Sequence, residues 1–270
     1  MPVIGQGTWE MEHEDRDRCI GALRAGIDAG MTHIDTAEMY GDGYVEEAIV
    51  APAIEGRRDQ IFLVSKVLPQ HATYEGTIAA CERSLRRLRT DRLDLYLLHW
   101  RGSHPLAQTL AAFRFLVDEE KIRYYGVSNF DSNDLEEALE VAGEARIACN
   151  QVMYHVEERA IERLVMPACE LHEIAVVAYS PFGHGRFPAP NAGPGRVLAA
   201  IARRHGVTPR AVALAFLTRL PSTFAIPKTS SPEHAAANAA AGDLRLSGEE
   251  LAEIDAAFPP PSSPRSLPML

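Results

Sequence analysis

The sequence predicts an α/β protein in which parallel strands form a closed (β/α)8 TIM barrel. About eight short apolar stretches are each followed by a segment in which apolar residues recur with helical spacing. Strand–helix alternation implies parallel strands joined by crossover helices. About eight such units in 270 residues favour a barrel over an open doubly wound sheet. The alternative is a Rossmann-type sheet, whose GxGxxG fingerprint is missing because Gly5-Gln-Gly7 is followed by Thr-Trp-Glu.

The first half of the chain contains four of these units. Apolar residues at Ile20, Leu23 and Ile27 predict a helix, and Gly30 caps it. The expected strands cover 3–7, 31–35, 61–67 and 93–98, and the expected helices cover 15–29, 44–54, 77–89 and 106–120.

The same alternation continues through the second half. Thr208-Pro209 is typical of a helix start, with a hydroxyl N-cap followed by proline, and Ser231-Pro232 repeats it. Ser247 and Glu250 have the spacing of a capping box. The expected strands cover 123–127, 147–151, 174–179 and 224–227, and the expected helices cover 134–141, 161–172 and 208–219, with two more beginning at 231 and 247. No linker splits this pattern, so we expect one domain over 1–258 and a proline-rich tail over 259–270.

Composition limits the classes of partner. A hydrophobic content of 46% with 24% charged residues is ordinary for a globular protein, and a net charge of −10 argues against nucleic acid. No apolar run approaches the length of a membrane span, and no signal sequence is recognisable. The scattered cysteines contain no CxxC pair, which favours reduced thiols. We therefore expect a cytoplasmic monomer without a membrane partner.

Polar and aromatic residues stand at the predicted C-terminal ends of the strands, where barrel enzymes carry their chemistry. Taken singly, each has an ordinary explanation, such as a surface charge or a structural histidine. Three titratable ones, however, end consecutive strands, which are neighbours in a barrel. The residues at the strand ends are Trp9, Asp35, Lys66, His99, Ser128, Asn129, Gln151, Tyr179 and Lys228.

Tyr40 follows Asp35 by five residues and completes a group that donates a proton. A free phenol has a pKa of about 10 and is a poor acid at neutral pH. The ammonium group of Lys66 favours the phenolate and makes the phenol more acidic, while Asp35 keeps Lys66 charged. His99 is placed to orient the oxygen of a substrate. Donation to an oxygen that becomes an alkoxide is what reduction of a small carbonyl compound requires.

A carbonyl reductase also needs a hydride, which a nicotinamide cofactor usually supplies. Lys228 and Thr229 precede a helix whose N-terminus offers unpaired N–H groups, a suitable site for an anion. His234 and Asn238 are four residues apart on one face of that helix. An equally good explanation from physics alone is a well-capped surface helix. A third possibility, metal-dependent hydrolysis at His33 and Asp35, has no further ligands nearby, so no metal is expected.

At the level of motifs, the sequence resembles the aldo-keto reductases. The matching stretches run in the order of that family over almost the whole chain, and the bacterial single-domain reductases of methylglyoxal or diketogluconate are the most similar type. The stretches are Gly-Gln-Gly-Thr-Trp (5–9), Ile-Asp-Thr-Ala-Glu-Met-Tyr-Gly (34–41), Val-Ser-Lys-Val (64–67), Asp-Leu-Tyr-Leu-Leu-His-Trp (94–100), Gly-Val-Ser-Asn-Phe (126–130), Asn-Gln-Val (150–152), Ala-Tyr-Ser-Pro-Phe-Gly (178–183) and Ile-Pro-Lys-Thr-Ser (226–230).

This resemblance implies roles for individual residues. Asp35, Tyr40, Lys66 and His99 match the catalytic tetrad, with Tyr40 as the general acid, and Trp9 and Trp100 match the walls of the substrate pocket. The implied contacts to an NADP cofactor are Thr8, Ser128, Asn129, Gln151, Tyr179, Ser180, Phe182, His184, Lys228, Thr229, His234 and Asn238.

Two departures from the family pattern carry consequences. His234 stands where many relatives have an arginine that binds the 2′-phosphate, and a largely neutral histidine gives less charge. Lys228 still favours NADPH, but the preference over NADH stays open. The short tail replaces a long specificity loop, so we expect an open pocket that accepts small aldehydes. The alternative to an enzyme is a redox sensor that binds nicotinamide with little turnover.

Overall fold

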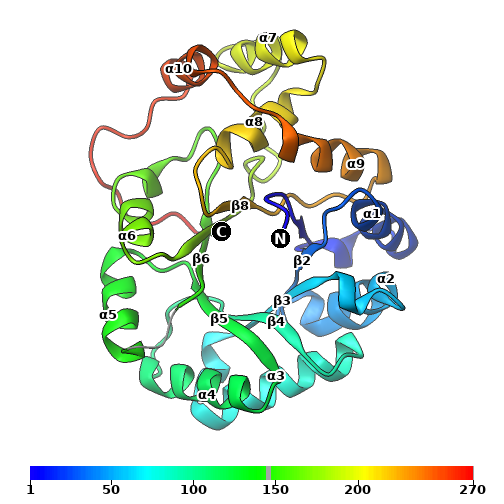
Figure 1. The fold of residues 1–270 in the computed structure, drawn as a ribbon, viewed down its shortest axis with the longest axis vertical. Helices are drawn as coiled ribbons and strands as arrows, with labels where there is room; N and C mark the ends of the chain where they lie inside the picture. The colour runs from blue at the N-terminus through cyan, green and yellow to red at the C-terminus, as the bar shows by residue number, and fades with distance from the viewer. Residues whose placement is uncertain (144–146, 270) are drawn as a thin grey trace.

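The computed structural model describes residues 1–143 and 147–269, and it contains the predicted barrel (Figure 1). One sheet of eight parallel strands runs in the order of the chain. The strands are β1 (Gln6–Gly7), β2 (His33–Asp35), β3 (Phe62–Val67), β4 (Leu93–Leu98), β5 (Ile122–Ser128), β6 (Cys149–Met153), β7 (Ala175–Tyr179) and β8 (Thr223–Ala225). Ile4 pairs in parallel with Ala225, which closes the sheet on itself.

The helices form an outer ring around these strands (Figure 1). They are α1 (Arg16–Asp28), α2 (Ala51–Ile54), α3 (Tyr74–Leu88), α4 (Leu106–Asp118), α5 (Ser132–Ala142), α6 (Val165–Leu171), α7 (Gly195–His205), α8 (Pro209–Leu217), α9 (Pro232–Ala240) and α10 (Gly248–Ala257). Short 3-10 turns cover Met11–His13, Tyr40–Gly43, Arg58–Gln60, Pro69–His71, Ala160–Glu162 and Ala241–Asp243. No helix among the described residues has the length and apolar content needed to cross a bilayer.

The predicted caps are confirmed. Thr208 accepts a hydrogen bond from the Ala211 N–H at 3.1 Å, and Ser231 accepts one from the His234 N–H at 3.3 Å. Ser247 and Glu250 form both bonds of a capping box. These side chains satisfy N–H groups that have no partner within their own helix.

One helix was missed, and some of the predicted elements differ in part from the structure. Helix α7 was not predicted, although Val197, Leu198 and Ile201 have helical spacing and Gly206 ends the helix at a φ of 66°. The helix expected over 44–54 is a π-helix over Val45–Val50 followed by the short α2. Pro52 in α2 has no N–H to donate to the regular ladder. Strand β6 lies two residues later than expected, because its pairing with β7 continues to Met153.

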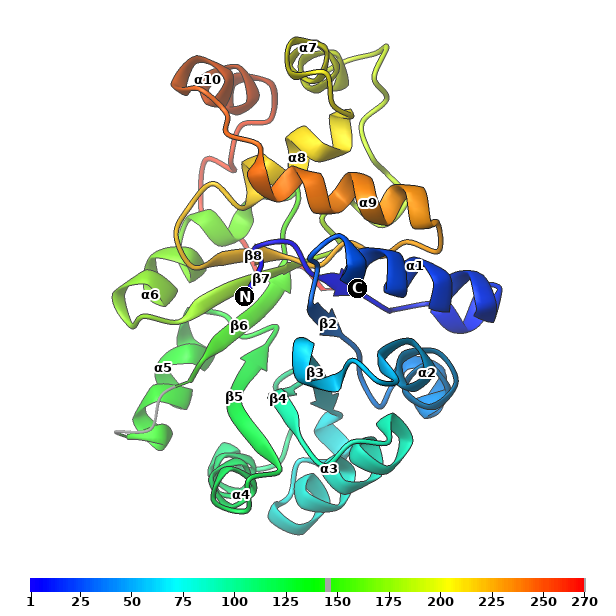
Figure 2. The same ribbon diagram turned by 45° about the vertical axis from the view of Figure 1, so that its right-hand side comes forward.

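Two apolar regions stabilise the barrel. Inside it, a small cluster includes Val64, Leu97 and Ile226, and a much larger cluster fills the space between the sheet and the helices. Helices α1 and α9 pack against each other, as Figure 2 shows, and so join the beginning of the chain to its end. Beyond α10 the chain runs past α6, where the Arg163 side chain donates to the Pro261 carbonyl at 2.8 Å. The last residue of the predicted tail, Leu270, lies outside the described residues.

Candidate active site

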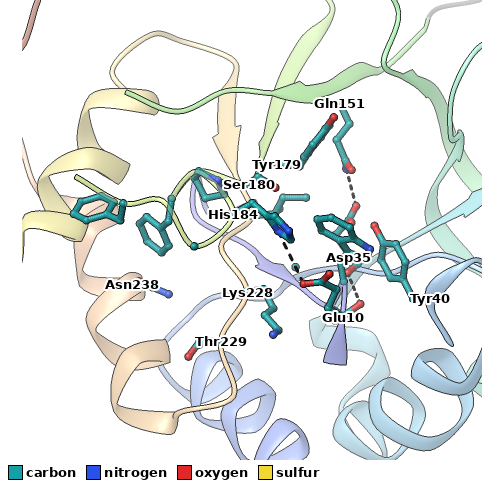
Figure 3. Close-up of a pocket in the computed structure, with 18 of the residues that line it drawn as sticks. Glu10, Asp35, Tyr40, Gln151, Tyr179, Ser180, His184, Lys228, Thr229 and Asn238 are labelled. Carbon is teal, nitrogen blue, oxygen red and sulfur yellow. Dashed lines mark hydrogen bonds and ion pairs between the residues drawn. The ribbon is translucent and has the colours of Figure 1, made fainter. Parts of the chain in front are cut away.

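A pocket of about 500 Å³ opens where the strands end (Figure 3). Figure 3 shows Asp35, Tyr40 and Gln151 at one end of this pocket and Asn238 at the other. All predicted site residues except Lys66 line it. They are Thr8, Trp9, Asp35, Tyr40, His99, Trp100, Ser128, Asn129, Gln151, Tyr179, Ser180, Phe182, His184, Lys228, Thr229, His234 and Asn238.

Lys66 lies beneath the floor of the pocket and contacts both of its predicted partners. Its ammonium group donates to a carboxylate oxygen of Asp35 at 2.6 Å, to the carbonyl of Thr36 at 2.9 Å and to the hydroxyl of Tyr40 at 3.1 Å. Three acceptors match the three N–H bonds of a lysine. Lys66 is completely buried, and Asp35 and Tyr40 are nearly so. The three side chains therefore form one rigid, dry group.

Asp35 is held by two further contacts. The Gln151 amide donates to its second carboxylate oxygen at 2.7 Å, and the Thr8 hydroxyl donates to its backbone carbonyl at 2.9 Å. Gln151 lies two residues before the end of β6, and the alternation of side chains along a strand still directs it into the barrel. The amide nitrogen of Gln151 is thus engaged within the protein.

The ionisation of this group differs in part from the expectation. Burial works against the charge of Lys66, but Asp35 and Tyr40 outweigh it and bring the lysine pKa above its ordinary value. Burial raises the pKa of Tyr40, and the opposing effect of Lys66 is smaller. The expectation that Lys66 makes Tyr40 more acidic than a free phenol is therefore wrong for the net pKa. Lys66 limits the rise that burial causes.

His99 stands beside Tyr40 as a neutral ring. The two rings meet edge to face with centroids 5.9 Å apart. Burial, with a smaller contribution from Lys66, brings the pKa of His99 well below its usual range. Within the described part of the chain its buried Nδ1 has no hydrogen-bond partner. A neutral imidazole at this position can donate a hydrogen bond to an oxygen without supplying a full charge.

Residues after β5 and β7 form one side of the pocket. Asn129 has a left-handed backbone with a φ of 58°, a conformation that asparagine tolerates better than most residues. Its amide donates to the His99 carbonyl at 3.2 Å, and its side-chain oxygen accepts from the Tyr179 hydroxyl at 2.9 Å. Ser128 donates to the Gln151 carbonyl at 2.8 Å. These bonds fix the half-buried ring of Tyr179 at the pocket wall.

The loops after β1 and β7 meet over the pocket. The rings of Trp9 and His184 stack with centroids 4.9 Å apart, and His184 Nδ1 lies 4.0 Å from a Glu10 carboxylate oxygen. Ser180 and His184 both have a φ of 49°, so the second loop turns sharply. Further along it, Phe187 lies under the guanidinium group of Arg210 at 4.9 Å.

The far end of the pocket lies between β8 and α9. Lys228, Thr229, His234 and Asn238 are brought together there, and Asn238 is buried. The ammonium group of Lys228 forms an ion pair with Glu14, from the loop before α1. The residues predicted for this end are thus neighbours, but the lysine already has an anionic partner.

Several lining residues were missed by the sequence analysis. They are Gly7, Glu10, Met39, Pro181, Gly185, Phe187, Thr208, Arg210, Ile226 and Ala237. The helix start at Thr208 was recognised, but a rule based on strand ends does not place α8 at the site, because α8 follows another helix and not a strand. Its position next to the pocket was the missing information.

The HxD pair at His33 and Asp35 does not act as a unit in this structure. His33 lies deeper in the barrel, and burial lowers its pKa to about 4. Both of its ring nitrogens are buried without a hydrogen-bond partner among the described residues, and its ring meets that of Phe62 edge to face at 5.8 Å. It is a neutral side chain of the barrel interior.

Comparison with known proteins gives consistent matches over the whole chain. The model of the aldo/keto reductase family matches residues 3–258. The methylglyoxal reductase YeaE of Escherichia coli is 43% identical over 272 residues, covering 100% of this chain and 95% of its own. An aldo-keto reductase from Klebsiella pneumoniae, crystallised with NADPH, is 47% identical with a TM-score of 0.94, over 100% of this chain and 95% of its own. Another Klebsiella pneumoniae structure, a complex with NADP and acetate, has 46% identity and a TM-score of 0.94, over 100% and 96% of the two chains.

Proposed function

The chain belongs to the aldo/keto reductase family and is therefore an oxidoreductase, and from this we propose that it reduces small aldehydes and ketones to alcohols with NADPH. In this proposal Tyr40 is the general acid, and Lys66, Asp35 and His99 assist it. The observation that carries the proposal is the buried contact of one ammonium group with the Asp35 carboxylate at 2.6 Å and the Tyr40 hydroxyl at 3.1 Å. This group lies at the floor of a ligand-sized pocket.

The residues along the pocket fit a nicotinamide dinucleotide. The fixed ring of Tyr179 offers an aromatic surface for a nicotinamide ring, and Ser128 and Asn129 lie beside it as polar partners for a carboxamide. Arg210 supplies positive charge for phosphate groups toward the other end, where Lys228 is a second cation that is paired with Glu14. The Klebsiella pneumoniae relatives crystallised with NADP or NADPH support this assignment.

When bound, the nicotinamide cofactor supplies the hydride that adds to the carbonyl carbon. The carbonyl oxygen gains the electron pair of its π bond and takes the proton of the Tyr40 hydroxyl, which leaves a phenolate. Lys66 stabilises the phenolate as a fixed positive charge at 3.1 Å, and Asp35 keeps that lysine protonated. His99 orients the carbonyl oxygen by a hydrogen bond. A proton from water then restores Tyr40.

The raised pKa of Tyr40 does not prevent this proton transfer. An alkoxide has a basicity similar to that of hydroxide, and the pKa of bulk water is about 15.7. A phenol has an ordinary pKa of about 10, so burial raises the pKa of Tyr40 from a starting value well below that of an aliphatic alcohol. The raised pKa also keeps the proton on Tyr40 at neutral pH, so the donor is present when a substrate arrives.

A small substrate fits the walls of the pocket. Trp9 and Trp100 line it beside Tyr40 and His99, and none of the described tail residues lines it. The relatives named for methylglyoxal and glyoxal reduction point to the same class of compound. We therefore propose methylglyoxal and similar small aldehydes as substrates.

The test compares Tyr40→Phe with Tyr44→Phe, a matched change at a tyrosine that is 44% exposed. With methylglyoxal and NADPH, Y40F should lose at least about 10²-fold in turnover, the lower range for general acid catalysis. Y44F should behave as the wild type. NADPH binding, followed by fluorescence, should be unchanged in both. A Y40F protein that keeps full turnover would refute the acid assignment. A wild type that binds NADPH but turns over none of a panel of aldehydes would favour the redox sensor.

A further inference from the structure

The lysine at the far end of the pocket is already neutralised by the protein. The Lys228 ammonium group donates to a carboxylate oxygen of Glu14, which lies 214 positions earlier in the chain. The two side chains are 29% and 35% exposed, so both can be reached from solvent. Hydrogen bonds from Lys228 and then Ser230 lower the pKa of Glu14, which is therefore a carboxylate at neutral pH. Lys228 offers no free charge to an incoming phosphate.

A second carboxylate, that of Glu233, accepts a hydrogen bond from a side chain of the same turn. The Ser231 hydroxyl donates to Glu233 at 2.6 Å, and this bond lowers the pKa of Glu233. Thus Glu14 and Glu233 engage the polar groups on either side of Thr229. The region where a ribose phosphate would lie thus has two carboxylates of the protein beside it, and the guanidinium group of Arg18 acts on both.

A ribose with a 2′-phosphate and a ribose with a 2′-hydroxyl meet these groups differently. The phosphate must compete with the Glu14 carboxylate for Lys228, and like charges close together repel each other. The hydroxyl can instead donate a hydrogen bond to a carboxylate, which is how an acidic residue recognises NAD in other dinucleotide sites. His234 beside this turn does not supply the permanent charge of an arginine.

We propose that Glu14 is a specificity-determining residue that weakens the preference of this pocket for NADPH over NADH. It holds Lys228 in an ion pair, opposes the 2′-phosphate and offers an acceptor to the 2′-hydroxyl. This inference rests on the proposed function, since it concerns the adenosine half of the same cofactor.

The test measures binding and not turnover. The quenching of Trp9 and Trp100 fluorescence gives the Kd of NADPH and of NADH for the full chain, its Glu14→Gln variant and the control Asp17→Asn. The control substitution removes one negative charge from the same acidic stretch. Asp17, however, is paired with Arg16, and its side chain is 83% exposed. E14Q should bind NADPH about three- to tenfold more tightly, as expected for one partly exposed charge. The affinity for NADH should stay the same or fall, and D17N should change neither by more than about twofold.

Four outcomes would overturn the inference, the last of them together with the proposed function. Equal tightening of NADPH binding in E14Q and D17N would show a general effect of charge. A parallel change for NADH in E14Q would show a structural role, and unchanged Kd values would show that Glu14 has no influence. A wild type that binds adenosine 2′,5′-bisphosphate but neither dinucleotide would refute the proposed function. The effect of E14Q could then still be measured, by comparing the Kd of the bisphosphate with that of adenosine 5′-monophosphate. A wild type that binds none of the four would overturn both.

Discussion

Replacing Asp35 with asparagine tests how the buried lysine keeps its charge. The side chains of Lys66 and Asp35 are 0% and 1% exposed, and their atoms lie 2.6 Å apart, so water screens this pair very little. Burial is the largest influence on the pKa of Lys66 and lowers it, and the carboxylate reverses that effect. Without the carboxylate, we expect the pKa of Lys66 to fall below its ordinary value of about 10.4.

The expected cost has a constant part and a part that depends on pH. Removing one partner of a buried ion pair costs about 3–5 kcal/mol of unfolding free energy. In Asp35→Asn, the unfolded chain binds a proton that the folded chain lacks wherever the pH lies between the lowered pKa and about 10.4. The free energy of unfolding therefore rises with pH there, by up to about 1.4 kcal/mol per unit.

In the wild type, the contribution of Lys66 to the free energy of unfolding changes with pH in the opposite direction. Its Lys66 has a raised pKa in the folded state, so the stabilisation by the pair is complete below the ordinary lysine value. This stabilisation is lost only as the pH rises through the folded pKa, above that value. Over the range from neutral pH to about 10, the difference between D35N and wild type should therefore shrink as the pH rises.

This difference is measured by urea unfolding of the wild type, D35N and the control Glu82→Gln. The measurements cover about pH 6 to 10, which lies below the ordinary pKa of lysine. Glu82 pairs with Lys121 at 2.7 Å, but their side chains are 41% and 29% exposed. E82Q should cost less than about 1 kcal/mol at every pH, because exposed pairs contribute little. The buried cysteines ionise on unfolding in all three proteins, and subtracting the wild-type values removes their effect.

Two results would refute this reasoning about Lys66. If D35N cost no more than E82Q, the buried ion pair would not be holding a desolvated charge. If the cost of D35N were large but the same at every pH, Lys66 would remain protonated without Asp35. In that case the protein would not depend on the carboxylate to keep a cation beside Tyr40.

Three further predictions concern stability and cofactor binding. Glu46 is buried, and burial raises its pKa. The folded protein therefore keeps the proton of Glu46 at pH values above about 4.3, the ordinary carboxyl pKa. As the pH rises through the raised pKa of the folded protein, that proton is lost and the free energy of unfolding falls. In urea unfolding, E46Q should therefore gain stability relative to the wild type as the pH rises above about 4.3, since it has no such proton to lose. In the same assay, Gly26→Ala should lower the free energy of unfolding by about 1–3 kcal/mol, because the added methyl group would lie 2.0 Å from the Gln6 side chain. The control G248A has open space around the added methyl group and should not lower it. Arg210 has no carboxylate partner among the described residues, so R210A should weaken NADPH binding about three- to tenfold by fluorescence titration.

Much of the proposed catalytic group could be predicted because it depends on strand ends. In a barrel, consecutive strands are neighbours, so Asp35 on β2 and Lys66 on β3 had to lie close together, with His99 directly after β4. Gln151 also belonged to the predicted set even though its strand was placed two residues too early. A shift of two residues preserves the face of a strand, and the side chain still points inward.

The rest depends on contacts between distant parts of the chain. The bridge between Ile4 and Ala225 of β8 brings the start of the chain, with Glu14, to Lys228, and two irregular loops bring Trp9 to His184. No local pattern encodes these contacts, because each is a consequence of how the barrel closes. The sign of the net pKa shift of Tyr40 was also unpredictable, since it depends on how far the phenol is buried.

Two lysine–carboxylate pairs stand at opposite ends of the pocket, and burial gives them different consequences. Lys66 and Asp35 are hidden from water, so a ligand cannot replace either partner without exposing a bare charge in the interior. That pair is suited to stay intact through a reaction. Lys228 and Glu14 are about one-third exposed, and water can solvate either side chain when they separate. In the function proposed above, the same chemical pair thus serves as a fixed part of the acid at one end and as an exchangeable contact for a ligand at the other.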